Sequence, residues 1–326
     1  MVPHRYRIER EKMKLMITGG AGFIGSNLAK YCLDQDPTSE IRILDDLSTG
    51  DIRNLDDVNV KFTEGSILDT ALVSTIANGM DSIVHLAAIP SVPRSIKTPR
   101  LSHDVNATGT LNVLESAREV GVNHVVVASS SSVYGSNPVL PKREDAWTRP
   151  MSPYAATKLL TEAYAVAYGY SYGLKTIAFR FFNVYGPGQA AGHSYAAVIP
   201  QFLDHALRGE RLPLEGDGTQ TRDFTYVTSV CAAIHNSVIH KIGSNSPVNL
   251  AFGTNTSLNS LIQTIERTIG STLVVEHKPT RVGDVYASQA DGTLFRSLFP
   301  SVEPVELELG IRATVEWFRT LQAKSS

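Results

Sequence analysis

The stretch KLMITGGAGFIGSNL at residues 14–28 decides the fold of this chain. Residues 15–18 have the pattern of a short buried strand, four glycines follow, and residues 26–33 have the pattern of a helix. The run GAGFIG at 20–25 fits the dinucleotide fingerprint, because its glycines permit a tight turn and bring a pyrophosphate close to backbone N–H groups at a helix N-terminus. A strand before the glycines and a helix after them give this motif its specificity.

An acidic residue completes the fingerprint. Asp45 ends the apolar run IRILD, about 20 residues beyond the glycines, where dinucleotide-binding proteins place an acid. A carboxylate at this place accepts hydrogen bonds from a ribose diol and repels a 2′-phosphate. The sequence therefore favours NAD over NADP.

A second motif indicates acid–base chemistry. Tyr154 and Lys158 lie four residues apart in SPYAATK, so that a helix places them on one face. An ammonium beside a phenol favours the phenolate and lowers the pKa of the tyrosine toward neutrality. Such a tyrosine can exchange a proton with a substrate hydroxyl near neutral pH. The run SSSSVYG at 129–135 supplies a serine hydroxyl that can hold the same oxygen.

Composition limits the classes of protein that the chain can belong to. With 326 residues, 42% hydrophobic and 19% charged, it has the composition of a soluble globular protein of one large or two medium domains. A net charge of −2 argues against nucleic acid or an anionic membrane as a partner. Only Cys32 and Cys231 occur, no cluster has metal-ligand spacing, and we expect a cytoplasmic protein without a metal. No stretch is apolar enough to cross a bilayer. We interpret residues 1–13 as a flexible tail and not as a signal peptide.

The order of predicted elements indicates the fold class. Strands expected at 15–18, 41–44, 60–63, 82–86, 125–129 and 176–179 alternate with helices, which predicts an α/β, Rossmann-type doubly wound parallel sheet. We assign 14–183 plus about 223–244 to an NAD-binding domain, and about 184–222 plus 245–326 to a smaller, discontinuous α/β substrate-binding domain.

Three further helices are expected, at 105–120, from 153 onward and at 196–207. The second of these has Ser152 as its N-cap and is apolar on nearly all sides. One side can face the sheet and the other a partner helix, which predicts a homodimer.

The assembled motifs resemble the extended short-chain dehydrogenase/reductase family, specifically its nucleotide-sugar epimerases. The resemblance covers nearly the whole chain after residue 13. It rests on the order and spacing of GGAGFIG at 19–25, DDLSTG at 45–50, HLAA at 85–88, Asn106, SSSSVYG at 129–135, SPYAATK at 152–158, RFFNVYGPG at 180–188, GDGTQTRDF at 216–224 and RVGDV at 281–285.

The resemblance implies an NAD site. Its glycines would hold the pyrophosphate, Asp45 the adenosine ribose, and Phe181 would flank the nicotinamide. The family often has Asp where this chain has Ser66, which contacts adenine and can still form a hydrogen bond. The full implied set is Gly19, Gly22, Phe23, Ile24, Gly25, Asp45, Asp46, Ser48, Gly50, Ser66, Ile67, Leu86, Ala87, Ala88, Asn106, Tyr154, Lys158 and Phe181.

The resemblance also implies a catalytic group and a UDP-sugar site. The catalytic residues would be Ser130, Tyr154 and Lys158. Among the substrate residues, an Arg suits phosphate because its guanidinium is planar and permanently charged. The implied substrate set is Ser91, Ser130, Ser132, Tyr154, Asn183, Val198, Arg222, Arg281, Asp284 and Ser288.

These features predict an NAD-dependent 4-epimerase of a UDP-hexose that works through a 4-keto intermediate and regenerates NAD in each cycle. UDP-GlcNAc/UDP-GalNAc, UDP-Glc/UDP-Gal or both are the expected pairs, since the family excludes N-acetyl groups with a Tyr where Ser288 stands here. The alternatives are a UDP-glucuronate 4-epimerase, a nucleotide-sugar dehydratase and a non-catalytic dinucleotide-binding protein. Dehydratases usually have an acidic pair where this chain has serines at 130–132, and glucuronate epimerases an Arg and a Thr in place of Ala190 and Asn183.

Overall fold

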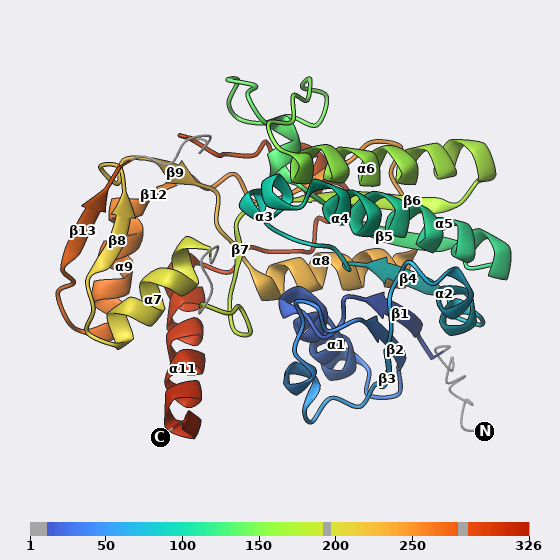
Figure 1. The fold of residues 1–326 in the computed structure, drawn as a ribbon, viewed down its shortest axis with the longest axis horizontal. Helices are drawn as coiled ribbons and strands as arrows, with labels where there is room; N and C mark the ends of the chain where they lie inside the picture. Colours follow the sequence, from blue (N-terminus) through green and yellow to red (C-terminus); the bar gives the residue numbers. More distant parts are fainter. Residues whose placement is uncertain (1–11, 192–196, 280–285, 326) are drawn as a thin grey trace, which may run out of the picture.

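A single parallel sheet organises the larger part of the molecule (Figure 1). The computed structural model describes residues 12–191, 197–279 and 286–325. The seven strands follow the order β11-β6-β5-β4-β1-β2-β3, which is the doubly wound order with one added edge strand. The Rossmann-type prediction is confirmed. The strands are β1 (Lys14–Thr18), β2 (Glu40–Asp45), β3 (Lys61–Glu64), β4 (Ser82–His85), β5 (His124–Ser130), β6 (Lys175–Phe181) and β11 (Val248–Leu250).

Helices cover both faces of this sheet, which is why its strands are continuous apolar runs. Leu15 and Ile17 of β1 pack into a core with α1 (Phe23–Gln35) and α8 (Val227–His240). Met16, on the opposite face, packs with the layer formed by α2 (Thr70–Ala77), α5 (Gly109–Val120) and α6 (Pro153–Tyr172). Figure 1 shows α5 and α6 in the upper part of the molecule and α1 in the lower part.

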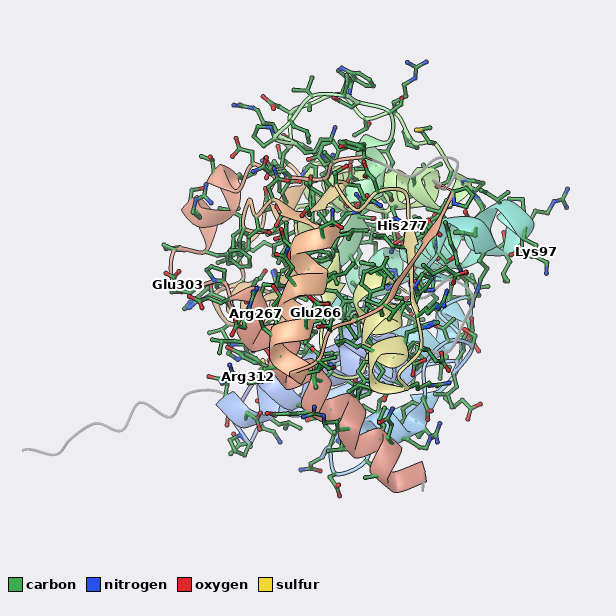
Figure 2. All side chains as sticks on the ribbon, turned by 90° about the vertical axis from the view of Figure 1, so that its left-hand side faces the viewer. Lys97, Glu266, Arg267, His277, Glu303 and Arg312 are labelled. Atoms are coloured by element: carbon green, nitrogen blue, oxygen red, sulfur yellow. The ribbon has the colours of Figure 1, made fainter. Side chains whose placement is uncertain are left out.

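The smaller domain packs around its own core. Parallel strands β8 (Leu212–Glu215) and β13 (Val275–Lys278) lie with helices α7 (Val198–Leu207), α9 (Leu258–Ile269) and α11 (Leu307–Ser325). Figure 2 faces this domain and shows Glu266 and Arg267 on α9 beside Arg312 on α11. The helix expected at 196–207 begins at Val198, and residue 196 lies outside the described residues.

The remaining elements are short. They are η1 (Ile52–Leu55), α3 (Val92–Lys97), α4 (Pro99–His103), the π-helical turn η2 (Asp104–Thr108), η3 (Ser131–Tyr134), α10 (Thr293–Leu298), and the strand pairs β7 (Val184–Tyr185) with β10 (Thr225–Tyr226) and β9 (Thr221–Arg222) with β12 (Thr256–Ser257).

The expected domain boundary is wrong after residue 244. Strand β11 joins the edge of the main sheet, where Leu250 pairs with Phe181. Phe295 and Phe299 pack into the core that contains α1 and α8, although 245–326 was assigned to the smaller domain. Strand β11 was not predicted because its three residues are too few to show an alternation of apolar and polar side chains. At the other end, Met13 does not belong to a tail: its side chain is buried and its carbonyl accepts from the Glu40 N–H.

Helix α6 begins as predicted, with the Ser152 side chain accepting from the Ala155 N–H. Its buried face is not purely apolar, however, because Lys158 and Glu162 lie there with less than a tenth of their surface exposed. The helix expected at 105–120 begins one residue earlier, with the π-helical turn η2 (Asp104–Thr108), in which Asn106 is buried.

Within the described residues no helix is long and apolar enough to span a membrane. Both cysteines are free and buried, Cys32 on α1 and Cys231 on α8. No group of three or more His, Cys, Asp or Glu side chains in the described ranges could hold a metal ion.

A buried histidine makes the stability depend on pH. His124 is fully buried at the start of β5, where its ring contacts the Ser82 hydroxyl and the Ile242 carbonyl. Burial lowers the pKa of His124 to about 4. The unfolded chain, with a histidine pKa of about 6.5, binds the proton first as the pH falls, so the folded state loses stability below about pH 6.5.

We therefore expect His124→Gln to flatten the pH dependence of stability. Between about pH 7 and pH 5 the wild type should lose about 2 kcal/mol more of its free energy of unfolding than the variant, measured by urea unfolding. The matched control is His103→Gln, at an exposed residue of α4. Equal losses in the wild type and in His124→Gln would contradict the assignment.

Candidate active site

The site begins where the order of the strands reverses, between β1 and β4. Gly19 follows β1 with φ of 72°, and a Cβ on it would lie 2.6 Å from the backbone nitrogen of Ala87, which follows β4. The two loops therefore touch only because residue 19 is a glycine. In open parallel sheets the crevice for a ligand lies at this point, beyond the carboxyl ends of the strands.

The glycine turn leaves room for an anionic ligand. A Cβ on Gly25 would lie 2.6 Å from the Cα of Gly20, so no other residue permits α1 to pack this closely on the turn. Helix α1 begins at Phe23, and its N-cap Gly22 provides no side-chain cap. The N–H groups of the first turn thus face a site that a pyrophosphate can fill.

Asp45 is fixed at the end of β2. Its Oδ2 accepts from the Ala21 N–H and its Oδ1 from the Leu47 N–H, both at 2.9 Å. Burial raises the pKa of Asp45, and the hydrogen bonds from the two N–H groups act in the opposite direction. A carboxylate held this way keeps lone pairs for the hydroxyls of a ribose, so the residues present fit NAD.

One cleft of about 1480 Å³ unites most of the expected residues. Sites for drug-sized ligands are roughly 300–1,000 Å³, so this cleft has room for a larger, extended ligand. The expected residues that line it are Gly19, Gly22, Phe23, Ile24, Gly25, Asp45, Asp46, Ser48, Ile67, Leu86, Ala87, Ala88, Ser91, Tyr154, Lys158 and Phe181.

Three expected cofactor residues do not line the cleft. Gly50 lies behind Asp45, because a Cβ on it would be 3.1 Å from that carboxylate. Ser66 accepts from the Leu68 N–H in its own turn. Asn106 is buried and uses its amide on the backbone of Ile89, at 2.7 and 3.2 Å. In the structure Asn106 therefore shapes the loop after β4.

The three residues expected to be catalytic lie at the end of β5 and in the first two turns of α6. Ser132 Oγ donates to Ser130 Oγ at 2.9 Å, and Ser130 in turn acts on the Tyr154 phenol as a hydrogen-bonding neighbour that lowers its pKa. Lys158 Nζ donates to the Ala128 carbonyl at 2.8 Å. The backbone N–H of Tyr154 donates to the buried Ser95 hydroxyl at 3.0 Å, which fixes the first turn of α6.

The electrostatics differ from the prediction. Burial raises the pKa of Tyr154, and the hydrogen bond from Ser130 opposes that rise. The neighbouring ammonium does not lower it, because Lys158 is itself buried, has its pKa lowered to about 8, and binds the Ala128 carbonyl. In the protein alone the protonated phenol is therefore favoured.

The expected sugar-side residues are more dispersed. Asn183 has a left-handed φ of 34° and donates to the Asp223 carbonyl at 3.1 Å. Asn tolerates this conformation, whereas a β-branched residue does not. Arg222 and Ser288 lie on neighbouring segments, since each bonds to the Thr221 carbonyl.

Among the described residues that line the cleft, neither Arg222 nor Ser288 occurs. Val198 begins α7, next to Ala197, which does line it. Arg281 and Asp284 lie outside the described residues.

The sequence reasoning missed a buried aspartate beside Arg222. The Asp223 carboxylate accepts from the Gly253 N–H, the Ala290 N–H and the Thr254 hydroxyl at 2.8–3.1 Å. It thereby ties three distant segments together. No local signal could have revealed it, because each partner is at least 30 residues away in the chain.

Four basic residues that line the cleft were also missed, namely Lys30, Arg53, Arg94 and Arg208. For Arg94 the available signal was its place three residues after Ser91, an expected substrate residue.

Together, a glycine turn at the switch point, a fixed acid on β2 and a Ser–Tyr–Lys group define a dinucleotide-dependent enzyme of the extended short-chain dehydrogenase/reductase class. The model of the NAD dependent epimerase/dehydratase family matches residues 15–251, and the chain belongs to this family. NAD is the cofactor of that family.

Known proteins are similar over almost the full chain. UDP-glucose 4-epimerase of Mycolicibacterium smegmatis is 36% identical over 313 residues, which cover 94% of this chain and 99% of that protein. UDP-glucuronate 4-epimerase of Thermodesulfobacterium geofontis is 32% identical, with 93% and 95% covered. Among solved structures, UDP-N-acetylglucosamine 4-epimerase from Methanobrevibacter ruminantium, in complex with UDP-N-acetylmuramic acid, superimposes with a TM-score of 0.90 at 34% identity, with 96% and 100% covered.

We expect Gly25→Ala to remove NAD binding, because the added methyl group would overlap the Gly19–Gly20 backbone. The purified variant should contain less than about a tenth of the wild-type NAD, since van der Waals overlap with backbone cannot relax as a side chain does. Gly169→Ala is the matched control, because its Cβ meets nothing closer than 3.4 Å. The measurement is the amount of NAD released from the purified protein by denaturation. An unchanged NAD content in Gly25→Ala would contradict the role of the glycine turn in NAD binding.

Proposed function

We propose that the protein is a 4-epimerase of a UDP-hexose. The observation that carries the proposal is that Tyr154 and Lys158, with Ser130 beside the Tyr154 phenol, lie at a cleft that the dinucleotide turn also lines. Membership of the epimerase/dehydratase family supports it. Dehydration is disfavoured because 130–132 are serines, with no acid to protonate a leaving hydroxyl.

Several side chains would take part in the proton transfer to and from the sugar. When bound, NAD supplies the acceptor and donor of the C4 hydrogen. Tyr154 Oη takes the proton from the sugar 4-hydroxyl and returns it after the 4-keto sugar has turned over. Ser130 donates to the same phenol oxygen, and Ser132 donates to Ser130, so a short relay stabilises the phenolate. Lys158, whose Nζ donates to the Ala128 carbonyl, would be the cation of this group.

We assign the UDP half of the substrate to the smaller domain. Asn183 and Arg222, with Arg281 and Asp284, remain our candidates for this part, whereas Val198 and Ser288 are candidates for the hexose. If the substrate is held through its UDP group, the hexose is free to rotate between two orientations. Epimerisation at C4 requires this rotation.

A uronic acid is the second candidate substrate, and Arg94 favours it. Its side chain lines the cleft near Ser91, and a guanidinium binds a carboxylate well. Ala190, where glucuronate epimerases have an Arg, also lines the cleft and offers no charge. A neutral hexose therefore remains our first choice.

Product analysis by NMR tests this function. The protein is incubated separately with UDP-GlcNAc, UDP-Glc and UDP-GlcA without added NAD, and we expect conversion to the galacto-configured product. Tyr154→Phe should retain NAD and lose at least about a hundredfold in turnover, because it lacks the acid–base group. Near-normal activity in that variant would exclude the proposed role. Conversion to a dehydrated keto sugar, or no conversion with NAD present, would instead support an alternative function.

The small side chain of Ser288 leads us to propose that N-acetylated hexoses are accepted at least as well as plain ones. Ser288→Tyr should lower kcat/KM for UDP-GlcNAc by about tenfold or more relative to UDP-Glc, because a bulky side chain takes the space of the N-acetyl group. Competition of the two sugars in one NMR sample measures the ratio. An unchanged ratio would show that another residue sets this preference.

We also propose a homodimer, in the cytoplasm, formed through α6. Ala156, Leu160, Ala163 and Ala167 repeat at helical spacing and are all exposed, which leaves an apolar stripe on the outer face of this helix. A second copy with the same stripe is self-complementary about a two-fold axis, and small residues let the helices approach closely.

Leu160→Arg should convert this dimer into a monomer in sedimentation velocity, because the charge would be buried in the helix contact. Leu309→Arg, at an exposed residue of α11, is the matched control and should stay a dimer. A monomeric wild type, or a dimeric Leu160→Arg, would rule out this interface.

A further inference from the structure

Three consecutive residues at the end of β5 contact α6. The Ala128 carbonyl accepts from Lys158 Nζ at 2.8 Å, and Ser130 is the hydrogen-bonding neighbour that lowers the pKa of the Tyr154 phenol. Between them, Ser129 Oγ donates to Glu162 Oε2 at 2.8 Å, with the Lys158 carbonyl at 3.3 Å as a secondary acceptor. Ser129 is 2% exposed.

Glu162 is a rigid anchor for this contact. Its carboxylate forms a bidentate pair with Arg180 of β6 at 2.6 and 3.0 Å, and the two side chains are only 4% and 3% exposed. The Arg180 guanidinium lies 4.7 Å above the centre of the Tyr134 ring, whose hydroxyl donates to Asn249 at 2.7 Å. The pair therefore cannot turn away from Ser129 without breaking a buried network.

We propose that Ser129 is a positioning residue of the reaction, which sets the register of the β5 end on α6 through Glu162 and so aligns the Ser130 hydroxyl with the Tyr154 phenol. The inference rests on the proposed function. The residues it names are one helical turn apart along α6, at 154, 158 and 162, and adjacent along β5, at 128, 129 and 130. The outer two contacts involve the Lys158 ammonium and the Tyr154 phenol, whereas the middle contact, made by a serine that also lines the cleft, involves neither of these groups.

The geometry explains why this contact controls the others. The Ser129 hydroxyl has one proton, and the nearest acceptor is a charged carboxylate, so its hydrogen bond is of the stronger, charge-assisted kind. Without it, the polar contacts that remain between the end of β5 and α6 are those of the long Lys158 side chain and of Ser130 with Tyr154, while β5 keeps its pairing with β6. Misplacement of reacting groups by about 1 Å can cost as much as a hundredfold in rate.

Two alanine variants in the same serine run test the proposal. Ser129→Ala removes the hydrogen bond to Glu162 and keeps the ion pair with Arg180, so it is milder than any change of Glu162. Ser131→Ala is the matched control, because its hydroxyl makes no hydrogen bond within the described part of the chain and it is not placed in the site. Ser129→Thr keeps the hydroxyl and serves as the rescue variant.

We expect Ser129→Ala to lower kcat by about tenfold or more, with KM within about threefold of the wild type, since the loss lies in alignment and not in binding. The rising limb of its kcat–pH profile should move to higher pH, because a weaker Ser130 hydrogen bond no longer opposes the pKa rise of Tyr154. Ser129→Thr should recover most of kcat. Ser131→Ala should match the wild type in all three respects.

A measurement without substrate separates this inference from the proposed function. In protein containing tyrosine isotope-labelled at Cζ, the Tyr154 signal is assigned by its absence in Tyr154→Phe. Its chemical shift should change in Ser129→Ala and not in Ser131→Ala, even if no UDP-sugar is converted. An unmoved Tyr154 signal would overturn the proposal, as would a Ser129→Ala enzyme whose kcat and pH profile equal those of Ser131→Ala.

Discussion

Parallel strands all end at the same edge of their sheet, and the whole site depends on this constraint. The glycine turn follows β1, Asp45 ends β2, Ala87 and Ser91 follow β4, and Ser130 ends β5. Residues more than a hundred positions apart in the chain are thereby brought to one cleft. Because the order of strands reverses between β1 and β4, the loops diverge there and leave room for a ligand, and Gly19 lets them touch at the base.

The features that could be predicted from the sequence are those that depend on residues close together in the chain. The glycine turn, the six main strands to within two residues, and the Ser152 cap all depend on neighbours in the chain. Strand β11 is too short to show a period, and Asp223 has all its carboxylate partners far away in the chain. The electrostatics of Tyr154 also depend on burial and on where the Lys158 ammonium points, which no spacing rule contains.

Asp223 and the Glu162–Arg180 pair show how a buried charge is used here. Asp223, between β9 and β10, ties this part of the chain to the loop after β11 and to the segment before α10. Glu162 and Arg180 lie under the catalytic edge and link α6 to β6. Replacing a buried ion pair by apolar residues often costs little stability, so stability alone gives a weak reason for charges at such places. A better reason for burying charged side chains at these places is that they form directional hydrogen bonds, which apolar packing cannot supply.

The two buried thiols have a consequence for how motions of this molecule can be followed. Cys32 and Cys231 lie on α1 and α8, the helices that cover one face of the sheet, and burial raises the pKa of both thiols. A thiol reagent reaches them only when this helix layer opens. The rate of thiol labelling therefore reports on how often the nucleotide-binding half opens. The two cysteines are intrinsic probes of local unfolding, and no introduced probe is needed.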